Sequence, residues 1–197
     1  LLEDADDGGA IALGGGSVLS ERVRAALGRH VVVWLQVGSG EAWRRIARSD
    51  RPLATGAEDV ARLLAAREPL YEELADAVVP AADRDVVARA LPAIQALADL
   101  PAGSKLLWAA SASGEYPVFV GPGLLDAIGR DRVRSREGTG TGWPLSGRRF
   151  LVSDTAVAAA YADRLGEVAG RAELEPGEGS KTMGGADRLL RGLGRAG

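Results

Sequence analysis

The stretch that decides the fold is Val-Val-Val-Trp-Leu-Gln, residues 31–36, inside a nearly continuous apolar run from His30 to Val37. Consecutive β-branched residues favour a strand, and the lack of polar alternation predicts burial on both faces. We therefore expect this strand to lie centrally in a parallel sheet. Segments with helical spacing flank it and can cover both faces, so the sequence predicts an α/β fold.

The residues before this run predict a strand and a helix. Gly9 to Leu13 is expected to form a strand that ends in the three glycines Gly14–Gly16. Ser20 is placed to cap the following helix, which Gly28 ends.

The residues after the run continue the alternation. The predicted elements are a basic helix from Glu41 to Arg48, a loop from Ser49 to Gly56, a helix from Glu58 to Asp76 that Pro69 breaks or kinks, a strand from Ala77 to Val79, and a helix from Asp83 to Leu100 that Pro92 bends.

A change of pattern near residue 100 predicts two domains. Residues 101–105 are expected to link a first domain, 1–100, to a second, 106–197. The second domain is predicted to begin with a β-hairpin. Its predicted elements are strands 106–110 and 116–120, a loop over 133–147, a strand at 149–153, a helix at 154–166, a strand at 172–174 and a helix at 183–193.

The composition excludes several partners. The 197 residues are 46% hydrophobic, enough to bury a core. The formal net charge is -3, and aromatic residues, at 5%, do not interleave the arginines, which argues against nucleic acid. No apolar run reaches the ~20 residues that span a bilayer, and the amino terminus lacks a secretion signal. We expect a cytoplasmic location and no membrane partner.

Cysteine and histidine usage limits the possible metal sites. The chain has no cysteine and one histidine, His30. Disulfides, thiolate metal sites and sites with paired histidines are therefore excluded within it. His30 lies at the edge of an apolar strand and is expected to be structural, so we predict no metal site.

Two features indicate a ligand. Gly14–Gly16 lack a Cβ, so their amides can approach an anionic or hydroxyl-rich ligand, although a tight turn alone would also explain glycines. Arginines gather between Arg44 and Arg51, and Arg67 follows on the next helix. Guanidinium groups suit phosphate or carboxylate, although a solvated helix face would explain an isolated cluster.

The order of five motifs distinguishes these alternatives. The motifs are Ile-Ala-Leu-Gly-Gly-Gly-Ser-Val (11–18), Val-Val-Trp-Leu (32–35), Arg-Arg (44–45), Arg-Pro-Leu (51–53) and Arg-Glu-Pro-Leu-Tyr-Glu-Glu (67–73). Together they resemble shikimate kinase over about residues 8–100. The resemblance implies a partial parallel sheet with helices, like that of a nucleoside monophosphate kinase. It implies that Gly14, Gly15, Gly16 and Arg67 bind shikimate, that Arg45 lies against the adenine of ATP, and that Arg51 belongs to the lid over ATP.

The resemblance is incomplete at the phosphate site. A shikimate kinase uses ATP and Mg²⁺, held by a glycine-rich loop that ends in Gly-Lys-Ser/Thr ahead of these motifs. The chain contains no such loop, and it lacks the acidic residue near the kinase amino terminus that engages the shikimate hydroxyls. No catalytic set is complete here. We expect weak shikimate binding and no phosphoryl transfer by the chain alone.

Three later segments look like the opening of 3-dehydroquinate synthase. They are Tyr-Pro-Val-Phe-Val-Gly-Pro-Gly-Leu-Leu (116–125), Phe-Leu-Val-Ser-Asp-Thr-Ala-Val (150–157) and Glu-Pro-Gly-Glu-Gly-Ser-Lys-Thr (175–182). This resemblance covers about residues 106–197 and implies a partial NAD-binding α/β domain. The residues that it implies for the NAD site are Asp154, Gly177, Glu178, Ser180 and Lys181. For Asp154, a plain helix N-cap is an equal alternative.

The synthase family uses NAD and a divalent metal, zinc or cobalt, to convert 3-deoxy-D-arabino-heptulosonate 7-phosphate to 3-dehydroquinate. Its metal ligands, a glutamate and two histidines, belong to later sequence in that family, as does a second glycine-rich NAD loop. We therefore expect NAD to bind more weakly than shikimate. A homodimer through this part is a further expectation.

Two functions of different class follow. The leading hypothesis is a fragment of a bifunctional enzyme of aromatic amino acid biosynthesis, with a kinase part followed by a synthase part. The alternative is a non-catalytic protein that binds shikimate or a nucleotide. A phosphate loop encoded upstream of Leu1 and a glutamate with paired histidines encoded after Gly197 would favour the enzyme.

Overall fold

The computed structural model of the chain describes residues 9–47, 56–81, 85–127 and 148–196. These residues form two compact units. The first comprises the described residues up to Ala98 together with Gly103–Gly121, and the second comprises Asp99–Ala102 and the described residues from Pro122 onward. The prediction of an α/β fold with parallel strands is confirmed, because both units combine parallel strands with helices.

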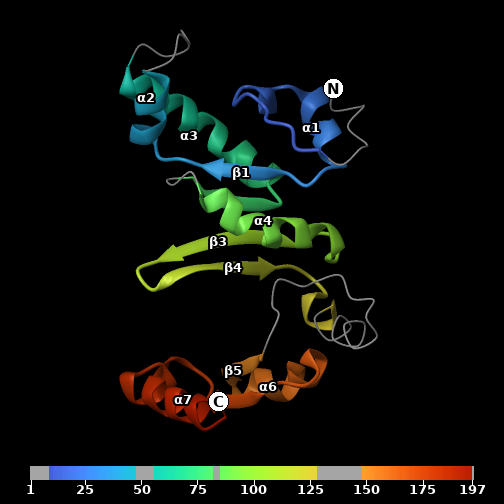
Figure 1. Cartoon of the computed structure of the whole chain (residues 1–197), viewed down its shortest axis with the longest axis vertical. Helices are drawn as coiled ribbons and strands as arrows, with labels where there is room; N and C mark the ends of the chain where they lie inside the picture. The colour runs from blue at the N-terminus through green and yellow to red at the C-terminus, as the bar shows by residue number, and fades with distance from the viewer. Residues whose placement is uncertain (1–8, 48–55, 82–84, 128–147, 197) are drawn as a thin grey trace. The chain divides into compact units, whose positions relative to one another are not determined.

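A four-stranded sheet organises the first unit, with its strands in the order β1-β2-β3-β4 (Figure 1). Its strands are β1 (Val33–Gln36), β2 (Ala77–Pro80), β3 (Lys105–Ser111) and β4 (Gly114–Val120). The helices in this part of the chain are η1 (Ser17–Leu19), α1 (Glu21–Leu27), α2 (Ser39–Ile46), α3 (Ala57–Leu74), α4 (Val86–Ala96) and η2 (Leu97–Asp99). The first three strands are parallel, and β4 returns antiparallel to β3.

The core of the first unit lies where β2 and β3 meet α4. Val79 and Leu106 are fully buried on these strands, and Ala90 and Ala93 bury the facing side of α4. Small residues on the helix allow it to approach the sheet closely. The apolar surface that this packing removes from water stabilises the unit.

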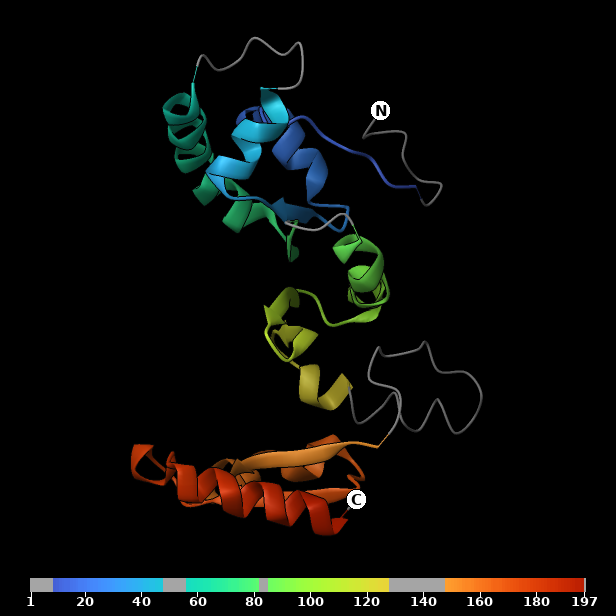
Figure 2. The same cartoon turned by 60° about the vertical axis from the view of Figure 1, so that its left-hand side comes forward.

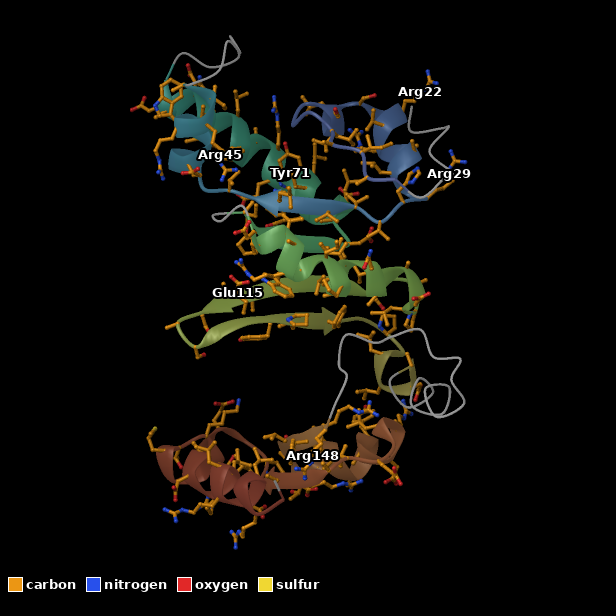
Figure 3. All side chains as sticks on the ribbon, viewed as in Figure 1. Arg22, Arg29, Arg45, Tyr71, Glu115 and Arg148 are labelled. Carbon is orange, nitrogen blue, oxygen red and sulfur yellow. The ribbon has the colours of Figure 1, made fainter. Side chains whose placement is uncertain are left out.

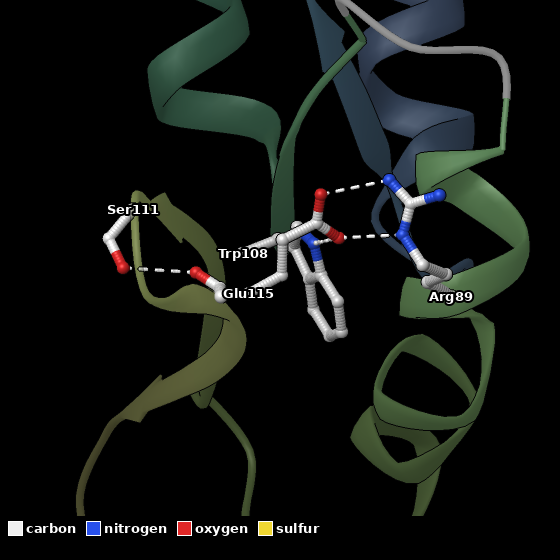
Figure 4. Close-up of polar contacts among 5 residues, drawn as sticks. Arg89, Trp108, Ser111 and Glu115 are labelled. Carbon is white, nitrogen blue, oxygen red and sulfur yellow. Dashed lines mark hydrogen bonds and ion pairs between the residues drawn. The ribbon is translucent and has the colours of Figure 1, made fainter.

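A polar cluster ties α4 to the predicted hairpin (Figure 4). The guanidinium of Arg89 donates through Nε and Nη2 to the two carboxylate oxygens of Glu115, each at 2.8 Å. The indole Nε1 of Trp108 donates to the same carboxylate at 3.1 Å. One carboxylate on β4 thus receives donors from α4 and from β3, which fixes the hairpin against the helix.

Two strand predictions for the first unit are wrong. Gly9–Leu13 forms no strand, and Ile11 is 41% exposed, because no described strand lies beside it to supply hydrogen bonds. The run His30–Val37 contributes only β1, which is an edge strand among the described residues, with Leu35 46% exposed. Composition favours burial, but the position of a strand depends on which neighbours pair with it.

The predicted helices are present, but the break at a proline is not, and Ser20 stands at the N-cap of α1 without a side-chain hydrogen bond to the helix. Pro69 lies inside α3 and Pro92 inside α4, and neither helix is interrupted. A proline removes one backbone donor, yet packing on the rest of a helix can keep it continuous. The predicted loops at 49–56 and 133–147 lie largely or wholly outside the described residues.

The hairpin predicted at 106–110 and 116–120 is confirmed as β3 and β4. Contacts group it with the first unit, because β3 pairs in parallel with β2 through Ala77–Leu106 and Val78–Leu107. Pro101–Ser104 connects η2 to β3, and Lys105 already lies in the strand. That residues 101–105 link two separate domains therefore stays a prediction.

The second unit is built on the parallel strands β5 and β6. Its elements are β5 (Phe150–Asp154), α6 (Thr155–Tyr161), η3 (Ala162–Leu165), β6 (Gly170–Leu174), η4 (Glu178–Ser180) and α7 (Met183–Ala196). Figure 2 shows α7, in red, running alongside the strands. The predicted order of strand, helix, strand and helix is confirmed.

Candidate functional site

The three glycines predicted to hold a ligand form an exposed turn that leads into η1. All three of their carbonyl oxygens are engaged within the protein. The Gly14 carbonyl accepts from the Ser17 amide at 2.8 Å, and the Gly16 carbonyl accepts from the Leu19 amide at 3.1 Å. The Gly15 carbonyl accepts from the hydroxyl of Tyr71 at 2.6 Å.

The amides of this turn remain available to a ligand. Among the described residues, no acceptor engages the N–H groups of Gly14–Gly16. The turn thus offers three N–H donors, while each of its carbonyls already accepts one hydrogen bond. Such a surface matches a ligand that presents oxygen lone pairs, as a hydroxyl or a carboxylate does.

The structure brings Arg67 to this turn. A Cβ built on Gly15 would lie 3.7 Å from Nη1 of Arg67 and 3.2 Å from the hydroxyl oxygen of Tyr71. The Arg67 guanidinium is half-buried, and no acceptor in the described part of the chain engages it. A half-buried cation beside a surface of donors is suited to an anion, above all a carboxylate.

Two aromatic residues complete the site, and the sequence reasoning assigned no role to either. Tyr71 follows Arg67 by four residues on α3, so both lie on one helix face. Its ring stacks on Trp34 of β1, with centroids 5.6 Å apart and planes at 30°. Figure 3 shows Tyr71 where α3 meets β1. The four-residue spacing from Arg67 is the signal that could have identified Tyr71.

Arg45 is fixed in place on α2. Its Nε donates to Glu41 at 2.8 Å, and its Nη2 donates at 2.8 Å to the carbonyl of Ala81, just after β2. The guanidinium thus spans from α2 to the end of β2. Arg51, expected on the lid, lies outside the described residues.

The predicted NAD residues of the second unit lie at one edge of its sheet. Asp154 ends β5 and pairs in register with Leu174, which ends β6, and the turn from Glu175 to Lys181 follows directly. The carboxyl ends of parallel strands share an edge, which is where α/β proteins bind nucleotides.

Local bonds already occupy several of these side chains. Asp154 caps α6, because its Oδ1 accepts from the Val157 amide at 2.8 Å. Ser180 donates to the Gly177 carbonyl at 2.9 Å, and Lys181 pairs with Glu178. Gly177 has φ +97°, a conformation that favours glycine. Lys181 and Glu178 are largely exposed, so water screens their ion pair and a ligand can displace it at little cost.

The described residues also bear on metals and membranes. They contain no group of three His, Cys, Asp or Glu side chains placed to hold a metal ion. His30 is half-buried, and its amide donates to the Leu27 carbonyl at 2.9 Å. None of the helices described is both long enough and apolar enough to cross a bilayer.

Comparison with known proteins finds a family match for the first part of the chain. Residues 2–97 match the family of shikimate kinases. The shikimate kinase of Frankia casuarinae is 44% identical over 84 residues, which are 41% of this chain and 37% of that protein. The shikimate kinase of Saccharopolyspora erythraea is 51% identical and that of Mycobacterium leprae 45% identical, over 36% and 34% of this chain and 43% and 36% of those proteins. The chain spans about two fifths of the length of such relatives.

The family match includes the predicted shikimate and ATP residues but not the predicted NAD residues. The glycine turn, Arg45, Arg51 and Arg67 all lie inside residues 2–97, which match the shikimate kinase family. The match ends before β3, so Asp154 and the turn from Glu175 to Lys181 lie beyond it. The synthase resemblance of residues 106–197 thus remains a proposal.

Proposed function

We propose that the first unit supplies the shikimate-binding part of a shikimate kinase, an enzyme of aromatic amino acid biosynthesis that phosphorylates shikimate with ATP. The observation that carries this proposal is the juxtaposition of Arg67 and the amides of the glycine turn. The shikimate kinase segment, residues 2–97, supports the choice of substrate.

Shikimate is a cyclohexene that bears one carboxylate and three hydroxyls, so it matches this surface group by group. The Arg67 guanidinium can donate two parallel hydrogen bonds to the carboxylate. The amides of Gly14–Gly16 can donate to hydroxyl lone pairs. Because each carbonyl of the turn is already engaged once and the amides are not, the turn would mainly hold the hydroxyls as acceptors and leave their protons for other groups.

The nucleotide half of the reaction involves Arg45. Its guanidinium is held between Glu41 and Ala81, which leaves it oriented rather than free to rotate. Such a fixed planar cation can stack on an adenine ring. Arg51 is proposed to contact ATP from the lid. ATP would bring Mg²⁺, which neutralises charge on the transferred phosphoryl group.

Phosphoryl transfer needs parts that the 197 residues do not contain. The sequence has no Gly-Lys-Ser/Thr phosphate loop, so the kinase activity is proposed for a protein that supplies one. The chain alone is expected to bind shikimate without phosphorylating it. A non-catalytic binding protein is the alternative, and it would show the same binding.

Titration calorimetry with shikimate tests the substrate assignment. Arg67→Ala should weaken binding at least about tenfold, because a charge-assisted hydrogen bond contributes ~1.5–3 kcal/mol. Arg62→Ala is the matched control, since Arg62 lies on the same helix, is 80% exposed and pairs with Asp59. Equal affinities for the wild type and Arg67→Ala would refute the assignment.

We propose further that residues 106–197 include the opening of a 3-dehydroquinate synthase, whose NAD would contact Asp154 and the turn from Glu175 to Lys181. Asp154 and this turn lie at one edge of the β5–β6 sheet, which favours the proposed NAD contact. Zinc or cobalt chemistry is not assigned here, because the family's two histidine ligands do not occur in a chain with one histidine. The homodimer remains a prediction.

Amide chemical-shift mapping with NAD tests the second proposal. Shifts should appear at Asp154 and across 175–182, and Lys181→Ala should abolish them because the ammonium offsets the charge of the pyrophosphate. Lys105→Ala is the control, since Lys105 is an exposed lysine on β3 of the first unit. Shifts that survive Lys181→Ala, or that fall elsewhere, would overturn the proposed NAD contact.

A further inference from the structure

We propose that Tyr71 is a positioning residue for the glycine turn: its hydroxyl holds the Gly15 carbonyl and so keeps the N–H of Gly16 turned away from Tyr71, where it can donate to a ligand. The role of the ligand in this inference rests on the proposed function. The orientation of the peptide rests on the contacts of Tyr71 alone.

The three carbonyls of the turn are held by different kinds of contact. Those of Gly14 and Gly16 accept from amides three residues further along, so they are part of the local turn and of η1. The Gly15 carbonyl accepts from Tyr71, which is 56 residues away in the sequence. Of the three carbonyls, that of Gly15 is the one held by a tertiary contact, within a turn that the Ser17 amide closes on Gly14.

Because the peptide is planar, fixing the Gly15 carbonyl also fixes the direction of the Gly16 N–H. The carbonyl of Gly15 and the N–H of Gly16 belong to one trans peptide unit, so they point in opposite directions. When the Tyr71 hydroxyl holds the carbonyl at 2.6 Å, the Gly16 N–H is turned away from Tyr71. Glycines on both sides of this peptide lack the Cβ that would otherwise restrict its rotation.

Tyr71 is itself held rigidly enough to act in this way. Its ring stacks on Trp34 of β1, and its backbone lies within α3. Arg67 lies one turn earlier on the same helix, with its Nη1 near the Cβ position of Gly15. One face of α3 thus carries both the Arg67 guanidinium and the Tyr71 hydroxyl, which orients the Gly15–Gly16 peptide.

Tyr71→Phe in the full chain tests the inference. The variant keeps the ring and its stack on Trp34 and removes only the hydroxyl. Shikimate affinity should fall about fivefold, as expected for the loss of one neutral hydrogen bond and its preorganisation. The Gly16 amide resonance should move and exchange faster with solvent in the absence of ligand. Tyr116→Phe is the matched control, because Tyr116 is a 53% exposed tyrosine on β4.

The two readouts separate this inference from the proposed function. An unchanged Gly16 amide in Tyr71→Phe would overturn the positioning role, whatever happens to affinity. A shifted Gly16 amide with unchanged shikimate affinity would also overturn it, because the orientation would then not matter for binding. Wild-type protein that does not bind shikimate would refute the proposed function, while the ligand-free amide measurement would still decide the orientation of the peptide.

Discussion

Gly185, in the first turn of α7, lies where the turn before the helix leaves no room for a Cβ atom. A Cβ on this residue would lie 2.3 Å from the carbonyl oxygen of Ser180, a backbone atom that cannot rotate away. The Gly185 amide also donates to the Thr182 hydroxyl at 3.1 Å. The backbone of Gly185 therefore packs directly against the turn from Glu175 to Lys181 at the start of the helix.

Gly185→Ala should therefore destabilise the second unit by about 1–3 kcal/mol, because the backbone must shift to admit the methyl group. Hydrogen exchange across β5 and β6 would measure the loss. Gly194→Ala is the control: it lies on the same helix with open space around its Cβ position, and it should be neutral or stabilising by about 0.5–1 kcal/mol. Equal exchange in both variants would contradict the steric argument.

Asp154 illustrates a residue with two roles to weigh. Its carboxylate caps α6, as the simpler of the two sequence interpretations held. A cap uses one oxygen, so the other can still accept from a ribose hydroxyl. The cap therefore does not decide whether the residue also binds NAD.

At the scale of elements, the β3–β4 hairpin extends the sheet whose first strands lie in the segment that matches the shikimate kinase family. β3 pairs with β2, Leu106 is fully buried, and Glu115 joins the hairpin to Arg89 of α4. β2 would otherwise present an open edge on this side, which favours association with other strands. The hairpin covers it, although it lies beyond the family match.

Leu106→Ala should destabilise the first unit by about 2–5 kcal/mol, since it leaves a cavity in a fully buried position. Hydrogen exchange should accelerate in β1 and β2, and strands β5 and β6 provide the internal reference. Leu107→Ala is the control, because the neighbouring leucine is 47% exposed and points to the other face of the strand. Exchange in β1 and β2 that is unaffected by Leu106→Ala would show that the hairpin is not part of this core.

At the scale of the whole molecule, two units share one chain but differ in what supports their function. The first contains the segment similar to shikimate kinases and a candidate site in which Arg67, Tyr71 and the glycine turn meet. The second has a strand–helix–strand arrangement and a glycine-containing turn at the edge where nucleotides bind in α/β proteins. Their proposed ligands are therefore tested by separate experiments.

The sequence by itself determined the α/β class, most helices and the hairpin, because these follow from local spacing and residue chemistry over a few neighbouring positions. The glycines and Arg67 of the proposed site were predicted from the resemblance to shikimate kinase. Only the tertiary structure decided that β1 is an edge strand among the described residues, that Gly9–Leu13 is not a strand, and that Tyr71 holds Gly15. Strand order and a hydrogen bond across 56 residues depend on which distant segments come together, and local spacing does not encode that choice.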